Sequence, residues 1–209
     1  MAYSLNEIDA MVLKAARGVG LSWGLAQEAG RAARWLTVAG IDGAALAADV
    51  LAAHDGNAQA MPGEGSAGWH ADGGPCCPLL LGAALSDRLP EVRDGFAAEL
   101  RHTLFLAPFL APFQAMPGQG QAQSRGVQIT GAATALTVFG RCCLGHGAPQ
   151  DMVTITVCDS APPAHVPRHS ATVDPKVWAL LDRFAGRTYA PATEASRLAG
   201  AGAGTTDND

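Results

Sequence analysis

A histidine, a carboxylate and two thiols lie within eight residues of one another: His70, Asp72, Cys76 and Cys77. Zinc binds such groups, but structural zinc sites usually take paired ligands two to four residues apart, and adjacent cysteines seldom both reach one ion. We therefore expect no metal here. Cys77 is also a candidate nucleophile, because a helix expected to begin near Pro78 would lower the pKa of a thiol at its N-terminus. A buried, inert cysteine is the alternative.

A second polar group lies near the C-terminus, outside any periodic element: Tyr189, Glu194, Ser196 and Arg197. Polar side chains this dense beside a proline often line a ligand site or a subunit contact, with Tyr189, Ser196 and Arg197 as the ligand-binding candidates. The glycine-rich segment 199–209 follows, and glycine accepts either sign of φ, so it could form an anion-binding nest. A flexible tail is the alternative.

The helix expected after Ser22 carries a polar face that includes Trp35. Glu28 and Arg31 are three residues apart, so an ion pair on a solvated face explains them simply. An exposed tryptophan beside arginines is also typical of protein interfaces. Trp35 and Arg31 are therefore the interface candidates, although packing within the chain explains them equally well.

Composition limits the expected partners. Charged residues make up 16% of the 209 residues, and the net charge is −5. Nucleic-acid-binding proteins usually show a basic patch, whereas the basic residues here are scattered, so neither nucleic acid nor an anionic membrane is expected. The longest apolar stretch, 103–116, is too short to span a bilayer. No P-loop, G-x-S-x-G or H-E-x-x-H motif is present, so the familiar nucleotide-binding and hydrolase classes are not indicated.

The cysteines bear on location. There are five, in two adjacent pairs and a single Cys158, with no C-x-x-C motif. An odd count and a beginning that does not resemble a signal peptide indicate reduced thiols in the cytoplasm.

Caps and periodicity predict three helices in the first fifty residues. Ser4 and Glu7 form a capping box, and Ser22 and Asp42 can each cap a further helix. Apolar residues then recur at helical spacing after each cap. The same reasoning predicts a last helix from Asp174 to Gly186, with proline at its first position.

The middle of the chain is mixed. Helices are expected over 78–87 and 90–101, and the repeat L-A-P-F at 106–113 is expected to be an extended edge segment because of its prolines. Strands are expected over 127–130, 135–139 and 152–158, the first two as a hairpin. Residues 55–75 read as a long glycine-rich loop, the length of a functional lid or a disordered segment.

These elements predict one globular domain of the α+β class. An N-terminal helical layer packs on a small, mainly antiparallel sheet, and a C-terminal helix covers it. A mixed α/β arrangement is the alternative, since some helices alternate with strands.

Three stretches carry a resemblance to a known family: S-L-N-E-I at 4–8, G-L-S-W-G-L-A-Q-E-A-G-R-A-A-R-W-L at 20–36, and the segment 188–209. They resemble a family of bacterial proteins that is a domain of unknown function with an N-E-I motif near its start. The resemblance implies a bacterial, cytosolic protein of about this size, and no activity or catalytic residue. If the segment 188–209 follows the family pattern, a binding site near Tyr189 to Arg197 is favoured over the alternative of a flexible tail.

Two functions remain open, with no cofactor indicated. The first is an accessory or ligand-binding protein that works with a metabolic enzyme, which the missing motifs slightly favour; a protein partner, a small ligand or an oligomer would each fit it. The second is a small-molecule enzyme with a pocket between the helices and the sheet, closed by 55–75. Its candidate catalytic groups would be Glu28, His70, Asp72, Cys77, Glu194 and Arg197, as proton-transfer groups, nucleophile and anion contact.

Overall fold

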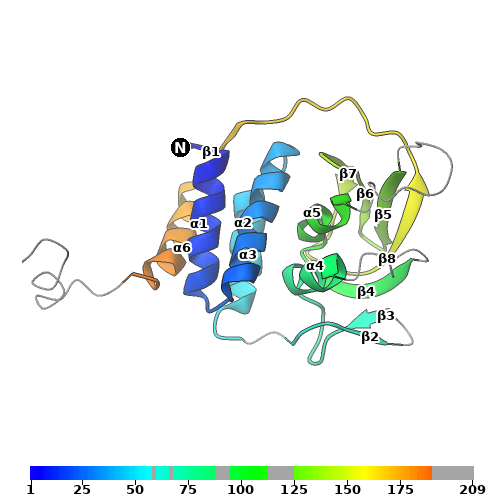
Figure 1. Ribbon diagram of the computed structural model, residues 1–209, viewed down its shortest axis with the longest axis horizontal. Coiled ribbons are helices and arrows are strands. Elements are labelled where there is room, and N and C mark those ends of the chain that lie inside the picture. Colours follow the sequence, from blue (N-terminus) through cyan, green and yellow to red (C-terminus); the bar gives the residue numbers. More distant parts are fainter. Residues whose placement is uncertain (58–59, 66–67, 88–94, 113–124, 190–209) are drawn as a thin grey trace, which may run out of the picture.

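The fold is described by a computed structural model over residues 1–57, 60–65, 68–87, 95–112 and 125–189 (Figure 1). Its helices are α1 (Leu5–Gly18), α2 (Trp23–Val38), α3 (Gly43–His54), α4 (Pro78–Asp87), the 3-10 turn η2 (Thr103–Leu106), α5 (Ala107–Leu110) and α6 (Pro175–Gly186). Its strands are β1 (Ala2–Ser4), β2 (Gly63–Gly65), β3 (Gly68–His70), β4 (Phe96–Arg101), β5 (Arg125–Gly131), β6 (Ala135–Val138), β7 (Cys143–His146), β8 (Gln150–Asp159) and β9 (Ser170–Thr172).

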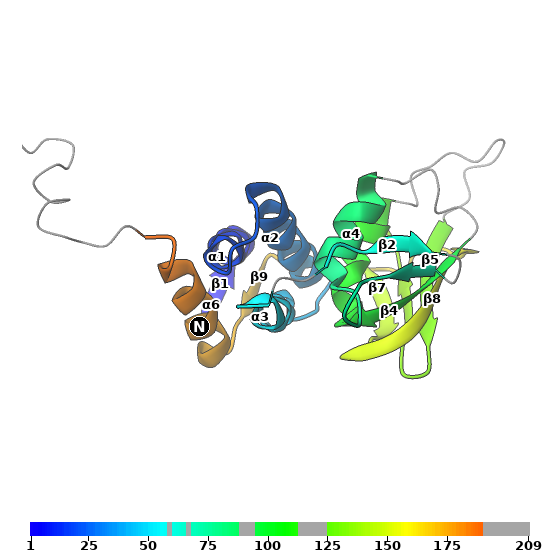
Figure 2. The same cartoon turned by 90° about the horizontal axis from the view of Figure 1, so that it is seen from below.

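The architecture is α+β, as the sequence predicts. Figures 1 and 2 show α1, α2, α3 and α6 grouped on one side of the molecule and the large sheet on the other, with α4 and α5 between them. The C-terminal helix α6 covers the outer surface of the helical layer, where it contacts α1 and α3. It does not cover the sheet.

The predicted caps begin the three N-terminal helices. The Ser4 hydroxyl accepts the backbone N–H of Glu7, while the Glu7 carboxylate accepts the backbone N–H of Ser4 at 2.7 Å. Ser22 and Asp42 cap α2 and α3 in the same way, each accepting a backbone N–H of the first turn. Because a capped first turn has fewer unsatisfied donors, each helix begins at a defined residue.

The large sheet has the strand order β2-β3-β4-β8-β5-β6-β7, and every neighbouring pair except β3–β4 is antiparallel. The predicted hairpin is β5–β6, with Ile129 opposite Leu136. β8 pairs with β5 so that Ile155 lies opposite Ile129, and all three side chains are buried. The alternating pattern therefore directs one face of the sheet toward α4 and α5.

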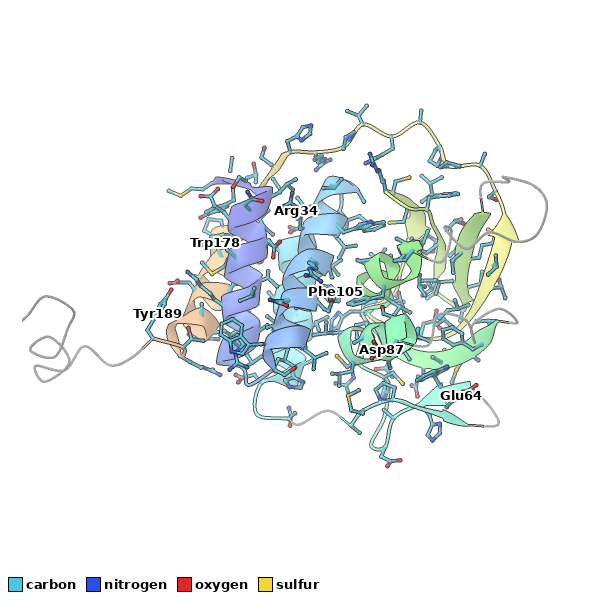
Figure 3. All side chains as sticks on the ribbon, in the orientation of Figure 1. Arg34, Glu64, Asp87, Phe105, Trp178 and Tyr189 are labelled. Carbon is cyan, nitrogen blue, oxygen red and sulfur yellow. The ribbon has the colours of Figure 1, made fainter. Side chains whose placement is uncertain are left out.

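Helix α4 joins two hydrophobic clusters. Leu79 and Leu80 pack into the helical layer, whereas Leu81 and Leu85 pack against the sheet. A helix that is apolar on all sides is buried on all sides, which explains why P-L-L-L-G-A-A-L lacks an amphipathic stripe. Phe105 of η2, fully buried, also packs into the helical cluster (Figure 3).

The helix predicted over 90–101 is wrong. Within the described part of that range, Phe96–Arg101 form strand β4, which pairs residue by residue with β8 from Ile155 to Gln150. The segment F-A-A-E-L-R contains good helix formers, but Ala98 and Leu100 alternate with more exposed neighbours and face the sheet core. Pairing with β8 overrides the local helical preference.

The extended segment predicted over 106–113 is also wrong. Thr103–Leu106 form a 3-10 turn, and Ala107–Leu110 form the short helix α5. Pro108 lies in the first turn of α5, where a helix needs no N–H donor, so the proline fits. Residue 113 lies outside the described residues.

The segment 55–75, predicted to be a loop, contains two short strands. β2 and β3 form a short antiparallel pair within it, and Trp69 is buried against the sheet cluster. The C-terminal segment 199–209 lies outside the described residues. No helix among the described residues is long and apolar enough to cross a membrane.

Candidate ligand-binding site

One wall of a large pocket is formed by the face of α2 that points to the sheet. Arg31, Arg34, Trp35 and Val38 line it at helical spacing. The opposite face of α2 meets α1 so closely that a Cβ on Gly30 would lie 2.8 Å from the Asp9 carbonyl oxygen. Tight packing on α1 fixes the orientation of α2, and with it the direction in which the wall residues project.

The second wall is the turn between β6 and β7, residues 139–142. The Phe139 N–H donates to the Cys142 carbonyl at 2.7 Å and closes the turn. Across the pocket, the Trp35 indole N–H donates to the Gly140 carbonyl at 3.2 Å. This hydrogen bond joins the helical layer to the sheet, and its two residues are 105 positions apart in the sequence.

The third wall is the strap, residues 160–169, which crosses in extended form from β8 to β9 (Figure 1). Pro162, Pro163, His165 and Pro167 line the pocket from this side. The Val38 carbonyl, at the end of α2, accepts the His165 Nε2–H at 3.0 Å and the backbone N–H of Arg168 at 3.2 Å. Because a carbonyl oxygen only accepts, Nε2 must carry the proton. The pocket enclosed by these three walls, the strap pocket, has a volume of about 710 Å³.

The strap pocket is cationic, although the chain has a net charge of −5. Its lining contains Arg31, Arg34 and Arg141, and no aspartate or glutamate among the described residues. Arg31 pairs with Glu28 at 2.9 Å, with 66% of its own side chain exposed, and Arg34 donates to the Asn6 side-chain oxygen. Arg141 makes no ion pair within the described part of the chain. A ligand that binds here therefore meets positive charge.

The polar groups of the strap pocket favour binding over proton transfer. Burial raises the pKa of the Cys142 thiol above its ordinary value, so the sulfur stays protonated and weakly nucleophilic near neutral pH. His165 uses one ring nitrogen on Val38. The described lining contains no aspartate, glutamate or lysine that could act with His165 as a general acid or base. The pocket can attract, orient and enclose an anion.

The structure separates most of the residues that the sequence nominated. Glu28 pairs with Arg31 on α2, His70 is exposed on β3, and Asp72 lies in the turn after β3. Tyr189 is 59% exposed just beyond the end of α6, away from the sheet (Figure 3). Glu194, Ser196 and Arg197 lie outside the described residues.

Cys77 directly precedes α4, as predicted, and its thiol accepts the backbone N–H groups of Leu79 and Leu80. Burial nevertheless dominates and raises the pKa of the thiol. The charged form is disfavoured because the sulfur is removed from water. A buried protonated thiol fits a packing role better than a nucleophile. The described residues contain no group of three or more His, Cys, Asp or Glu side chains placed to hold a metal ion.

Trp35 is half-buried rather than exposed, and it packs against both hydrophobic clusters. Trp35 and Arg31, the interface candidates from the sequence, both line the strap pocket. The sequence pattern missed Arg141 and the strap altogether. A signal was available in A-P-P-A-H-V-P-R-H at 161–169, because closely spaced prolines favour an extended chain.

Residues 3–63 match the family model described as Protein of unknown function (DUF3726). The DUF3726 region spans most of the helical layer and the α2 wall of the strap pocket, but neither the 139–142 turn nor the strap. It contains the first two stretches of the resemblance noted from the sequence, whereas 188–209 lies beyond it. Neither the curated proteins nor the solved structures yielded a match to the chain.

Proposed function

We propose that this chain is a ligand-binding protein that holds an organic anion with a planar apolar body in the strap pocket. The observation that carries the proposal is the cationic lining of that pocket on a chain of net charge −5. Three arginines without an acidic lining neighbour among the described residues attract an anion and reject a cation.

The apolar part of the lining supports a ligand larger than an inorganic ion. Trp35, Phe139 and three strap prolines contribute ring surfaces. The volume of about 710 Å³ lies within the range of about 300–1,000 Å³ that small-molecule pockets occupy. An arginine fork binds carboxylate or phosphate oxygens in its plane, so the ligand class is an aromatic or otherwise planar carboxylate, sulfonate or phosphate.

The role we propose is non-catalytic: the chain holds its ligand in the cytoplasm and supplies it to, or withholds it from, a metabolic enzyme. The protonated Cys142 and the absence of a carboxylate in the described lining support this role over catalysis in the same pocket. The five cysteines, all free thiols in the structure, agree with a reducing compartment.

The test uses anilinonaphthalene sulfonate, an anion with a planar aromatic body that fluoresces when removed from water. We expect saturable binding to the full chain. Arg34→Ala and Arg141→Ala should each weaken it about 2- to 5-fold, as expected for partly exposed charge contacts. The double variant should weaken it about 10-fold. Raising the salt concentration should reduce the difference between wild type and variants.

The matched control is Lys14→Ala, which removes one positive charge from an exposed position on α1. It should bind the probe like wild type. Equal weakening by Lys14→Ala would show that net charge, rather than the strap pocket, attracts the probe. Unchanged affinity in the double variant, with the fold intact by circular dichroism, would refute the proposal. Conversion of a natural anion retained in native mass spectrometry would favour an enzyme instead.

A further inference from the structure

A second pocket lies at the opposite end of the contact between the helical layer and the sheet. It has a volume of about 340 Å³, and its lining includes Asn57, Asp72, Gly74 and Arg101. α2 and α3 are antiparallel neighbours, so the end of α2, which borders the strap pocket, and the end of α3, which leads to Asn57, face opposite ways (Figure 1). The two pockets are therefore separate sites.

Arg101 provides a fixed positive charge in this second pocket. It is the last residue of β4, and its backbone N–H donates to the Cys76 carbonyl at 3.2 Å. Its Nη2 lies 4.0 Å from the position that a Cβ on Gly74 would occupy. Within the described residues, its Nε is buried and has no hydrogen-bond partner. The guanidinium therefore keeps donors that the described residues leave unused, and a carboxylate placed against its fork in this pocket would accept from it.

Asp72 provides a negative charge on the facing turn. The Gly74 N–H donates to the Ala71 carbonyl at 3.4 Å and closes a tight turn with Asp72 in it. Gly73 and Gly74 have φ values of 93° and 132°, which residues with a side chain rarely adopt. The turn geometry thus holds Asp72 at the rim of the pocket. Asp72 and Arg101 form no ion pair with each other or with any other residue in the described part of the chain, so within that part both charges are open to a ligand.

We propose that this pocket binds a small zwitterion of the α-amino acid type, with its carboxylate on Arg101 and its ammonium group on Asp72. One cation and one anion line a pocket of about 340 Å³, large enough for an amino acid and small for a nucleotide. A simple anion would meet the Asp72 carboxylate, and a simple cation would meet the Arg101 guanidinium. Only a ligand that carries both charges satisfies both. The Asn57 amide adds a donor and an acceptor at the same rim.

The test measures thermal unfolding of the full chain with each proteinogenic amino acid, and with propionate and ethylamine as single-charge analogues of alanine. At about ten times its Kd, a bound amino acid should raise Tm by about 3–5 °C. The single-charge analogues should have no effect. If no amino acid shifts Tm and none binds by calorimetry, the proposal is wrong.

Two variants identify the groups involved. Asp72→Asn changes an exposed turn residue and should leave the fold intact; it should abolish the amino-acid effect and allow propionate to bind. Asp182→Asn, on the exposed face of α6, is the matched control and should behave as wild type. Amino-acid binding that survives Asp72→Asn would overturn the proposal. Arg141→Ala should leave this binding unchanged, which separates the result from the fate of the strap pocket.

Discussion

The hydrogen bond from His165 to Val38 should hold the strap closed over its pocket. In His165→Ala, the Val38 carbonyl keeps the Arg168 N–H but loses the imidazole. Val38 ends α2, so the strap would be attached to the helical layer at one point instead of two. We expect the strap to open more often while the rest of the fold keeps its stability.

The magnitude follows from the geometry. A part-buried hydrogen bond of 3.0 Å contributes about 0.5–1.5 kcal/mol net. Local opening of the strap should therefore become about 2- to 12-fold more frequent. The free energy of global unfolding should change by less than about 0.5 kcal/mol, because the strap lies outside both hydrophobic clusters.

Hydrogen exchange of the Arg168 amide measures this opening directly, because that N–H is bonded to the same Val38 carbonyl. The exchange rate of this amide should rise about 2- to 12-fold in His165→Ala. His169→Ala, an exposed neighbour in the strap, is the control and should leave the exchange rate unchanged. Unaltered exchange in His165→Ala, or equal acceleration in both variants, would refute the assigned role of His165.

Three further predictions concern the scaffold. In Gly43→Ala the new Cβ would lie 2.0 Å from a carbonyl oxygen of α2, so the free energy of unfolding in urea should fall by about 1–3 kcal/mol. In the control Gly24→Ala the new Cβ meets nothing within 4 Å, and the free energy of unfolding should rise by up to about 1 kcal/mol. Equal losses in the two variants would contradict the close approach of α2 and α3. Hydrogen bonds from backbone N–H groups, chiefly that of Ala133, hold the pKa of Asp151 below 3.8. The native state therefore releases the Asp151 proton more readily than the unfolded state does. The ionised carboxylate stabilises the fold fully above the unfolded-state pKa, and this contribution disappears as pH falls through the folded-state pKa. The stability advantage of wild type over Asp151→Asn should accordingly shrink below about pH 4 in urea titrations. Burial raises the pKa of Cys143 to about 12, so iodoacetamide at pH 8 should alkylate this thiol in urea but not in the folded chain. A similar alkylation rate in both conditions would show that the thiol is exposed to solvent in the folded chain.

Local chemistry was enough to predict the helical layer. Ser4, Ser22 and Asp42 each satisfy a donor of a first turn by a side chain close in sequence, and an amphipathic face repeats within each helix. The same holds for the β5–β6 hairpin, whose strands are neighbours along the chain. Interactions over three to ten residues can be read from spacing alone.

The elements predicted wrongly depend on distant partners. F-A-A-E-L-R becomes strand β4 because β8, whose residues lie 49 to 59 positions beyond their partners in β4, supplies its hydrogen bonds. Pro108 enters a helix because α5 begins just before it and packs between the two main layers. The alternation of Phe96, Ala98 and Leu100 with Ala97, Glu99 and Arg101 is compatible with a strand, but so short a segment does not identify its partner.

The sequence by itself determined the fold class, the caps of the N-terminal helices and the acidic balance that makes nucleic acid an unexpected partner. Tertiary structure decided where the two proposed ligand sites lie. Arg34, Arg141 and His165 come from a helix, a turn and the strap, and Asp72 and Arg101 line one pocket from a turn and the end of β4. Charges that are scattered along the chain become a site only when packing brings them together, because electrostatic attraction depends on distance in space.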